Sequence, residues 1–129
     1  MKTYPAIAVP AGWILLALTL FLVAAPAAST PTAQTEQTIR HLIDHVSGSG
    51  LTFVRNGREY TPQEAAEHML KKYHHFHDDI DSAEDFIALC ASKSLLSGKA
   101  YEVIDSQGKA LLTGDWLRAE LAAYRVRKP

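Results

Sequence analysis

Histidines and carboxylates crowd one short stretch of the chain, and together they have the chemistry of a metal site. Four of the six histidines lie in His68–His77, and three aspartates occur in the next four residues. On a helix, His74 lies three residues before His77 and four before Asp78, so the three side chains project from neighbouring positions. Imidazole and carboxylate groups are ligands for Zn²⁺ and similar ions. These three residues are a candidate zinc site, and the alternative is a solvated polar face of the helix.

Hydroxyl and ammonium groups crowd a second stretch, Ala91–Tyr101, which holds three serines, two lysines and a glycine. Such a set could hold an anion. A small hydrolase-like enzyme would use Ser92 or Ser94 as its nucleophile, with Lys93 or His68 as the assisting group. The stretch contains neither a P-loop nor a known nucleophile motif, because the residues around its glycine and its serines do not fit. The alternative is helix capping followed by a turn into a strand.

Composition excludes several classes of protein. The 129 residues include 13 Lys and Arg against 14 Asp and Glu, with no basic block, so a nucleic-acid partner is not expected. One cysteine excludes a disulfide framework. Cys90 lies four residues after Phe86 and three after Ile87, on the apolar face of its helix, so we expect a buried and inert thiol.

Residues 1–27 have the pattern of a secretory signal peptide. Lys2 is the only charged residue before Glu36, an apolar run follows it, and Ala25–Ala27 offers a small-residue cleavage site. The alternative is an uncleaved anchor, since Ala6–Ala28 is uncharged and about 20 residues span a bilayer. We therefore expect a periplasmic or secreted protein, or a membrane-anchored one that faces the periplasm. It would touch the membrane only through this segment, and only if the segment is not cleaved.

Apolar side chains that recur every three or four residues predict the helices that position these groups. A flexible leader is expected at residues 28–35, and the first helix at Glu36–Val46, where His41 and His45 flank the apolar stripe. A capping box at Thr61–Glu64 opens the second helix, whose apolar stripe continues to Ile80.

A second cap, Ser82–Asp85, predicts a third helix that Ser97 and Gly98 close. Asp115 is expected to cap a fourth helix on which three apolar side chains share a face. The fold predicted for residues 36–126 is a small single α+β domain of about four helices with two short β-hairpins.

The first hairpin carries the strongest local signal. Asn56 and Gly57 tolerate the positive φ angles of a type I′ turn, which places Phe53 opposite Tyr60. The second hairpin is predicted from two short strands around residues 106–108.

With these elements in order, the mature chain resembles a bacterial family of exported domains of unknown function, number 5329. The likeness covers nearly all of Glu36–Arg125, and its specific pieces are Phe53–Gly57, Ala65–His68 with Lys72, Ala83–Ile87, Ser92–Tyr101 and Asp115–Leu117. A signal sequence precedes a small domain in this family, so the resemblance agrees with export. It implies no activity, substrate or cofactor.

The resemblance also marks polar family features, and together with Ser97 these are the candidate binding residues: Arg55, His68, Lys72, Glu84, Ser92, Ser94 and Tyr101. Their alternative role is to hold the fold through hydrogen bonds. The residues Ser97–Tyr101 are also similar to a short S-G-x-x-Y pattern of bacterial lysozyme inhibitors. We expect a non-catalytic exported binding or accessory domain whose partner is an envelope protein or polymer. A zinc-binding module and a hydrolase-like enzyme are the alternatives.

Overall fold

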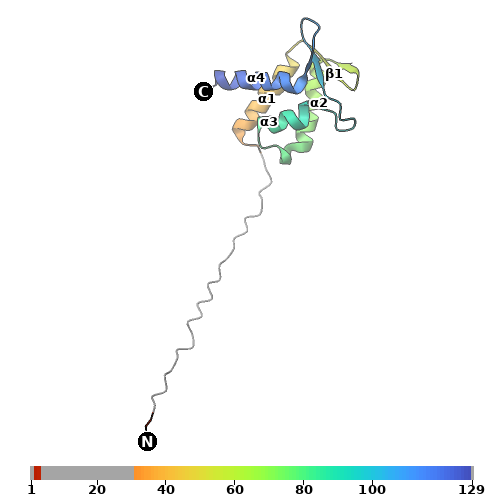
Figure 1. Ribbon diagram of the computed structural model, residues 1–129. Coiled ribbons are helices and arrows are strands. Elements are labelled where there is room, and N and C mark those ends of the chain that lie inside the picture. Colours follow the sequence, from red (N-terminus) through yellow and green to blue (C-terminus); the bar gives the residue numbers. More distant parts are fainter. Residues whose placement is uncertain (1, 4–30, 129) are drawn as a thin grey trace.

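The computed structural model describes residues 2–3 and 31–128, so the predicted signal segment lies outside the described residues apart from Lys2 and Thr3. The described chain forms four α-helices and four short strands, which confirms a small α+β fold. The helices gather on one side of the sheet (Figure 1). Among the described residues, no helix is both long enough and apolar enough to cross a membrane.

Helix α1, Ala33–Ser47, begins three residues earlier than its apolar period predicts, inside the segment that we expected to be a flexible leader. The Thr32 hydroxyl accepts a hydrogen bond from the Thr35 amide and caps the helix there. The core face of α1 consists of Ile39, Leu42 and Val46.

Helix α2, Pro62–Phe76, opens with the predicted capping box, in which Thr61 and Glu64 exchange side-chain to backbone hydrogen bonds. It ends four residues before Ile80, because the chain tightens into a short 3₁₀ helix, η1, at His77–Asp79. Ile80 is still fully buried. The apolar stripe therefore predicted the core correctly but not the end of the helix.

Helix α3, Ala83–Phe86, opens with the second predicted cap, which is a full capping box, and continues into a π-helical turn, η2, Ile87–Ala91. We expected this helix to run to Ser97, but it ends with η2. The Ser92 hydroxyl donates a hydrogen bond of 2.6 Å to the Ile87 carbonyl oxygen. The side chain thereby satisfies an acceptor that the end of the helix leaves open.

Helix α4, Thr113–Arg127, begins directly after a strand, and Leu112 at its N-cap makes no side-chain hydrogen bond. The prediction that Asp115 is the cap is therefore wrong. Asp115 lies in the first turn, where the helix dipole favours a carboxylate, and it pairs with Arg118 at 3.0 Å. The predicted apolar face is buried and consists of Leu117, Leu121 and Tyr124.

The two predicted hairpins join into one antiparallel sheet of order β2-β1-β3-β4. Its strands are β1 Thr52–Arg55, β2 Arg58–Tyr60, β3 Glu102–Ile104 and β4 Ala110–Leu112. Phe53 pairs with Tyr60 as predicted, and its other neighbour is Val103 of β3. Asn56 and Gly57 have φ angles of 51° and 75°, as a type I′ turn requires.

Candidate functional site

Four of the eight candidate binding residues meet at one place, and we call Arg55, His68, Lys72 and Tyr101 the cationic cluster. Arg55 is the last residue of β1, His68 and Lys72 lie one turn apart on α2, and Tyr101 directly precedes β3. Because β1 pairs with β3 and contacts α2, the segment before β3 meets two segments that lie much earlier in the sequence. Residues four apart on a helix share a face, so both α2 side chains point the same way.

Arg55 lies against a neutral histidine. Its Nη1 atom is 2.6 Å from Nδ1 and 2.7 Å from Nε2 of His68, and its Nη2 donates to the Tyr60 hydroxyl at 2.9 Å. The pKa of His68 is lowered from 6.5 to about 4, mainly by burial and in addition by the positive charges of Arg55 and Lys72. The imidazole is therefore uncharged at neutral pH and accepts from the guanidinium.

Lys72 is a buried cation, with only 8% of its surface exposed. Its ammonium donates to the Lys93 carbonyl oxygen at 3.0 Å and to the Tyr101 hydroxyl at 3.3 Å. Burial lowers the pKa of Lys72 and raises that of Tyr101, so both shifts favour the uncharged form of the group, and the phenol is neutral near pH 7. Within residues 31–128, neither Lys72 nor Arg55 forms an ion pair with a carboxylate.

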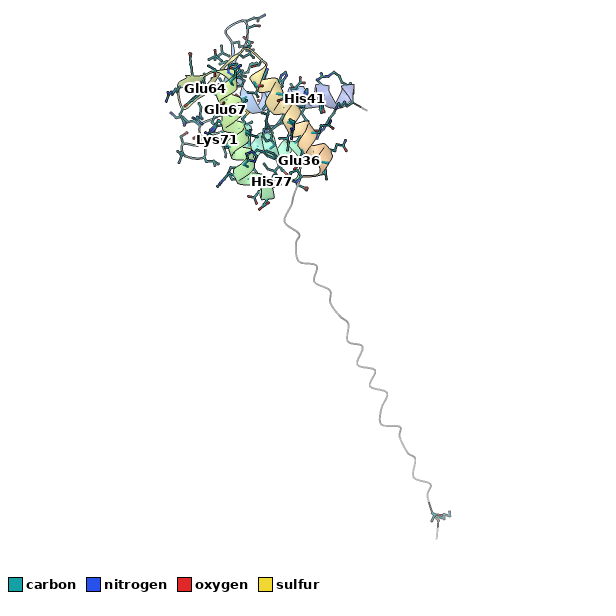
Figure 2. The ribbon with its side chains drawn as sticks, turned by 180° about the vertical axis from the view of Figure 1, so that it is seen from behind. Glu36, His41, Glu64, Glu67, Lys71 and His77 are labelled. Atoms are coloured by element: carbon teal, nitrogen blue, oxygen red, sulfur yellow. The ribbon has the colours of Figure 1, made fainter. Side chains whose placement is uncertain are left out.

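A cavity of about 220 Å³ opens beside the cluster. It is lined by Arg55, His68 and Tyr101 of the cluster, together with Tyr60. Lys72 is not part of the lining but donates to the Tyr101 hydroxyl. The other side chains of its lining include the apolar Phe53, Val54, Ala65 and Met69, and Glu64, Glu67 and Lys71 of α2. Figure 2 shows these last three in a row along α2. The cavity thus combines an apolar wall, donors from the cluster and a charged row on α2 that includes the carboxylates of Glu64 and Glu67.

Thr113 also lines this cavity, and no pattern in the sequence pointed to it. It is fully buried, and among the described residues its Oγ1 atom has no hydrogen-bond partner. Leaving a buried hydroxyl unpaired costs about 1–3 kcal/mol.

Tyr60 was predicted only as the strand partner of Phe53, although its alternating position on β2 places it on the face that α2 covers.

The three candidate serines lie outside the cavity lining. Ser92 closes η2, and a Cβ atom at Gly114 would approach its Oγ to 2.6 Å. Ser94 accepts from the Asn56 amide at 3.3 Å, and Ser97 donates to the Asn56 side-chain oxygen at 2.5 Å. Within the described chain, no hydrogen bond joins these hydroxyls to His68 or to the ammonium of Lys93. The contacts of Ser94 and Ser97 hold the loop against the first hairpin.

Glu84 is not brought to the cavity either. It pairs with Arg125 across the exposed surface between α3 and α4. The hydrogen bond from Arg125 is the main reason that the pKa of Glu84 is lowered.

The candidate metal ligands gather at the C-terminal end of α2. His77 lies 3.5 Å from a carboxylate oxygen of Glu36 and 3.6 Å from one of Asp78. His74 is exposed and joins no such pair with any residue that the structure describes. Across residues 31–128, no three His, Cys, Asp or Glu side chains are grouped so that they could hold a metal ion. Zinc binding stays a prediction.

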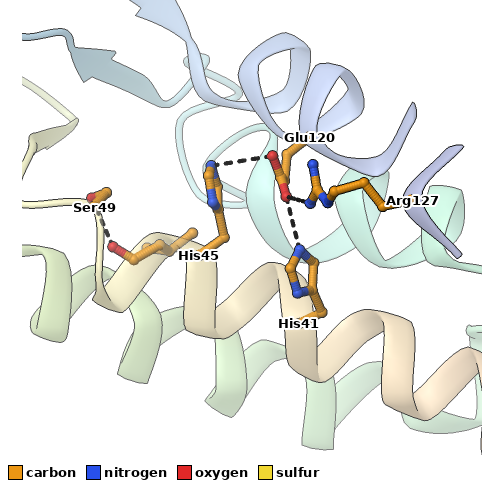
Figure 3. A network of polar contacts seen from close by, with 6 residues as sticks. His41, His45, Ser49, Glu120 and Arg127 are labelled. Atoms are coloured by element: carbon orange, nitrogen blue, oxygen red, sulfur yellow. Dashed lines mark hydrogen bonds and ion pairs between the residues drawn. The ribbon is translucent and has the colours of Figure 1, made fainter. Parts of the chain in front are cut away.

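A second charged group, the α1–α4 network, consists of His41, His45, Glu120 and Arg127 (Figure 3). Glu120 lies 2.8 Å from His41 Nε2, 3.9 Å from His45 Nε2 and 2.7 Å from Arg127 Nη2. Burial alone would raise the pKa of Glu120, but the hydrogen bonds from His41 and Arg127 prevail and lower it. The His41 ring also stacks on Tyr124 at 3.9 Å. The network holds α1 against α4.

Comparison with known proteins finds relatives of unknown function. The model of a family described as "Family of unknown function (DUF5329)" matches residues 33–125. The chain is 35% identical over 89 residues to the uncharacterized protein YfeK of Salmonella typhimurium strain LT2, which covers 68% of this chain and 74% of that protein. No solved structure matches the chain. Both charged groups lie almost entirely within the part that the family model covers.

Proposed function

The chain belongs to DUF5329, a family of unknown function, and we propose that its domain is a non-catalytic binding module whose cavity receives a small anionic group. The observation that carries this proposal is the cationic cluster beside the cavity. Its two basic side chains, Arg55 and Lys72, have no carboxylate partner among the described residues. A bound anion would supply the missing charge.

The charge of the cluster supports this reading. Lysine is almost never fully buried unless it is paired, because its ammonium loses hydration on burial. Lys72 keeps two neutral acceptors and no opposite charge. Arg55 uses its donors on His68 and Tyr60, and a guanidinium has five N–H groups, so further donors are left for a ligand. Hydrogen bonds between charged groups are about twice as strong as neutral ones.

The tautomer of His68 with its proton on Nε2 accounts for the Nδ1 contact with Arg55 and for the contact with Tyr101. Arg55 donates to Nδ1, and Nε2–H donates to the Tyr101 oxygen, which also accepts from Lys72. The Tyr101 oxygen then accepts twice, and its own proton is free to donate to a ligand. The cluster would thus present two kinds of donor to an anion, the guanidinium and the phenol.

The apolar wall of the cavity indicates what the anion is attached to. Phe53, Val54 and Met69 give the ligand a surface on which to bury hydrocarbon. A carboxylate on a short apolar group therefore fits better than a free inorganic ion. The predicted signal segment would deliver the domain to the periplasm, so we take the ligand to be part of an envelope protein or polymer.

Thermal unfolding in the presence of anions tests the proposal. Acetate, 3-methylbutanoate and inorganic phosphate are titrated against the protein, with 3-methylbutanoate expected to bind best. A ligand at about 100 times its Kd stabilises a protein by ~2.7 kcal/mol. For a domain of this size, the midpoint should rise by roughly 10 °C.

The variant Arg55→Met removes a cavity donor, and Arg118→Met is its matched control because Arg118 pairs with Asp115 on the surface. We expect Arg55→Met to weaken binding at least tenfold, as expected for a lost hydrogen bond to a charged group. Arg118→Met should leave it unchanged. Equal responses of the two variants, or no stabilisation by any of the three anions, would contradict the proposal.

A further inference from the structure

Two leucines stand at the tip of the loop between η2 and β3, and we call Leu95 and Leu96 the apolar tip. Leu96 is 99% exposed and Leu95 is 60% exposed. The loop and the β1–β2 hairpin protrude together from the same side of the domain (Figure 1). Single exposed leucines are common, but two in succession on one protruding loop form a coherent apolar surface.

Hydrogen bonds hold the loop that carries this tip in a fixed shape. The Ser94 amide donates to the Lys99 carbonyl oxygen and the Gly98 amide to the Ser94 carbonyl oxygen, both at 2.9 Å. Gly98 has a φ of 70°, which an L side chain rarely adopts. Asn56 ties the loop to the first hairpin through Ser94 and Ser97. The leucines are thus presented by an ordered loop, so ordering them on binding costs little.

Lysines flank the tip on both sides. Lys93 and Lys99 are exposed, no acidic residue occurs in Ala91–Tyr101, and neither lysine forms an ion pair within residues 31–128. The surface is therefore apolar at its end and positive at its base. Charge complementarity selects a partner that is negative at its surface and apolar below it.

We propose that the apolar tip inserts into the interface of an anionic lipid membrane while Lys93 and Lys99 contact the headgroups. Two leucine side chains on a projecting loop are too small for a stable protein interface, which takes about 800 Å² from each partner. Lysine is also depleted in protein interfaces, whereas basic residues beside an anionic leaflet favour binding. The contact brings the cavity close to the membrane surface, and it is independent of what the cavity binds.

A fluorescent label at position 96 tests this proposal in the full chain. Leu96→Cys can be labelled selectively, because Cys90 is fully buried and burial raises its pKa to about 12. The dye is polarity-sensitive, and the vesicles are phosphatidylcholine alone or phosphatidylcholine mixed with phosphatidylglycerol. The matched control carries the dye at Val126→Cys, an 83% exposed apolar position near the end of α4.

We expect the emission at position 96 to shift to the blue with the anionic vesicles only, while that at position 126 stays constant. With Lys93→Gln and Lys99→Gln added, the shift should need at least tenfold more anionic lipid. Arg55→Met should leave the response unchanged, which separates this proposal from anion binding in the cavity. Membrane attachment through the N-terminal segment alone would leave position 96 in water.

Four results would overturn the proposal. They are no shift at position 96, equal shifts at both positions, a shift that phosphatidylcholine alone produces, and a shift without vesicles. The last of these would indicate that the leucines contact a second copy of the chain.

Discussion

The cationic cluster and the α1–α4 network are built from similar residues but differ in their role. Each places histidine and arginine between secondary structure elements and links them to a tyrosine. The network contains a carboxylate, Glu120, that contacts three positive or protonatable groups. The cluster contains none among the described residues. The two regions differ in charge balance and not in residue type.

This difference separates a structural contact from a binding site. In the network each charge has its partner inside the protein, so the contacts stabilise the packing of α1 on α4. In the cluster the protein bears the cost of burying Lys72 with no internal gain from an opposite charge. Such a cost is typical of sites that a ligand completes. Substitutions in the network should therefore lower the free energy of unfolding, whereas removing the charge of Lys72 should leave it constant or raise it.

The largest expected effect is in the network. Glu120→Met leaves His41 and Arg127 without their acceptor, so the free energy of unfolding should fall by about 2 kcal/mol. The midpoint of thermal unfolding would fall by roughly 10 °C. Anion binding by the cavity should not change. A loss below about 0.5 kcal/mol would mean that the network does not hold the helices, and the comparison would fail.

The second prediction concerns pH. The pKa of His68 is about 4 in the folded protein and near 6.5 in the unfolded chain. As the pH falls below 6.5, His68 becomes protonated in the unfolded chain but stays neutral in the folded protein until about pH 4. The free energy of unfolding therefore decreases across this window. His68 is half-buried, and solvent screening reduces the effect to about 1 kcal/mol.

His68→Gln should flatten the curve of unfolding free energy against pH between 6.5 and 4. Part of the slope will remain, because burial lowers the pKa of His45 as well. Glu120 acts in a separate window, since its lowered pKa means that its contribution is lost only below its ordinary 4.5. An unchanged slope in His68→Gln would show that this imidazole does not resist protonation.

The third prediction separates stability from binding at Lys72. Lys72→Met removes a buried charge and keeps most of the volume, so unfolding free energy should stay constant or rise by up to about 1 kcal/mol. The Tyr101 hydroxyl and the Lys93 carbonyl lose a donor, which limits the gain. Binding of 3-methylbutanoate should weaken at least fivefold, because one positive charge is gone. If Lys72→Met were clearly less stable than the unchanged protein, Lys72 would have a structural role, as Glu120 does.

Local signals in the sequence were enough for much of the fold. The Asn56–Gly57 turn and the caps of α2 and α3 were predicted correctly, because the residues that decide them lie within four positions of one another. Helix ends were less predictable. The end of η2 depends on the Ser92 side chain, and the start of α4 depends on the strand that precedes it.

The candidate site was predictable only in part, and for a physical reason. The resemblance to the family singled out Arg55, His68, Lys72 and Tyr101, but their meeting depends on β1 pairing with β3, two strands about fifty residues apart. Nothing local indicates such a pairing. Thr113 was missed because a buried threonine at a helix start has no pattern of its own. Its significance lies in its Oγ1 atom, which has no hydrogen-bond partner in the part of the chain that the structure describes.

The smallest effect is expected at Glu84, which the resemblance groups with the cluster residues. Its pair with Arg125 is exposed, with about half of each side chain accessible to water. Exposed ion pairs contribute little, so Glu84→Gln should change the unfolding free energy by less than about 0.5 kcal/mol and leave binding of 3-methylbutanoate unaltered. Denaturant unfolding and the anion titration, run beside Arg55→Met, measure both. If Glu84→Gln weakened anion binding as much as Arg55→Met does, a surface charge outside the cavity would govern the ligand. Anion binding would then depend on the overall electrostatic potential of the domain and not on Arg55 and Lys72, and the contrast between the two charged regions would no longer explain it.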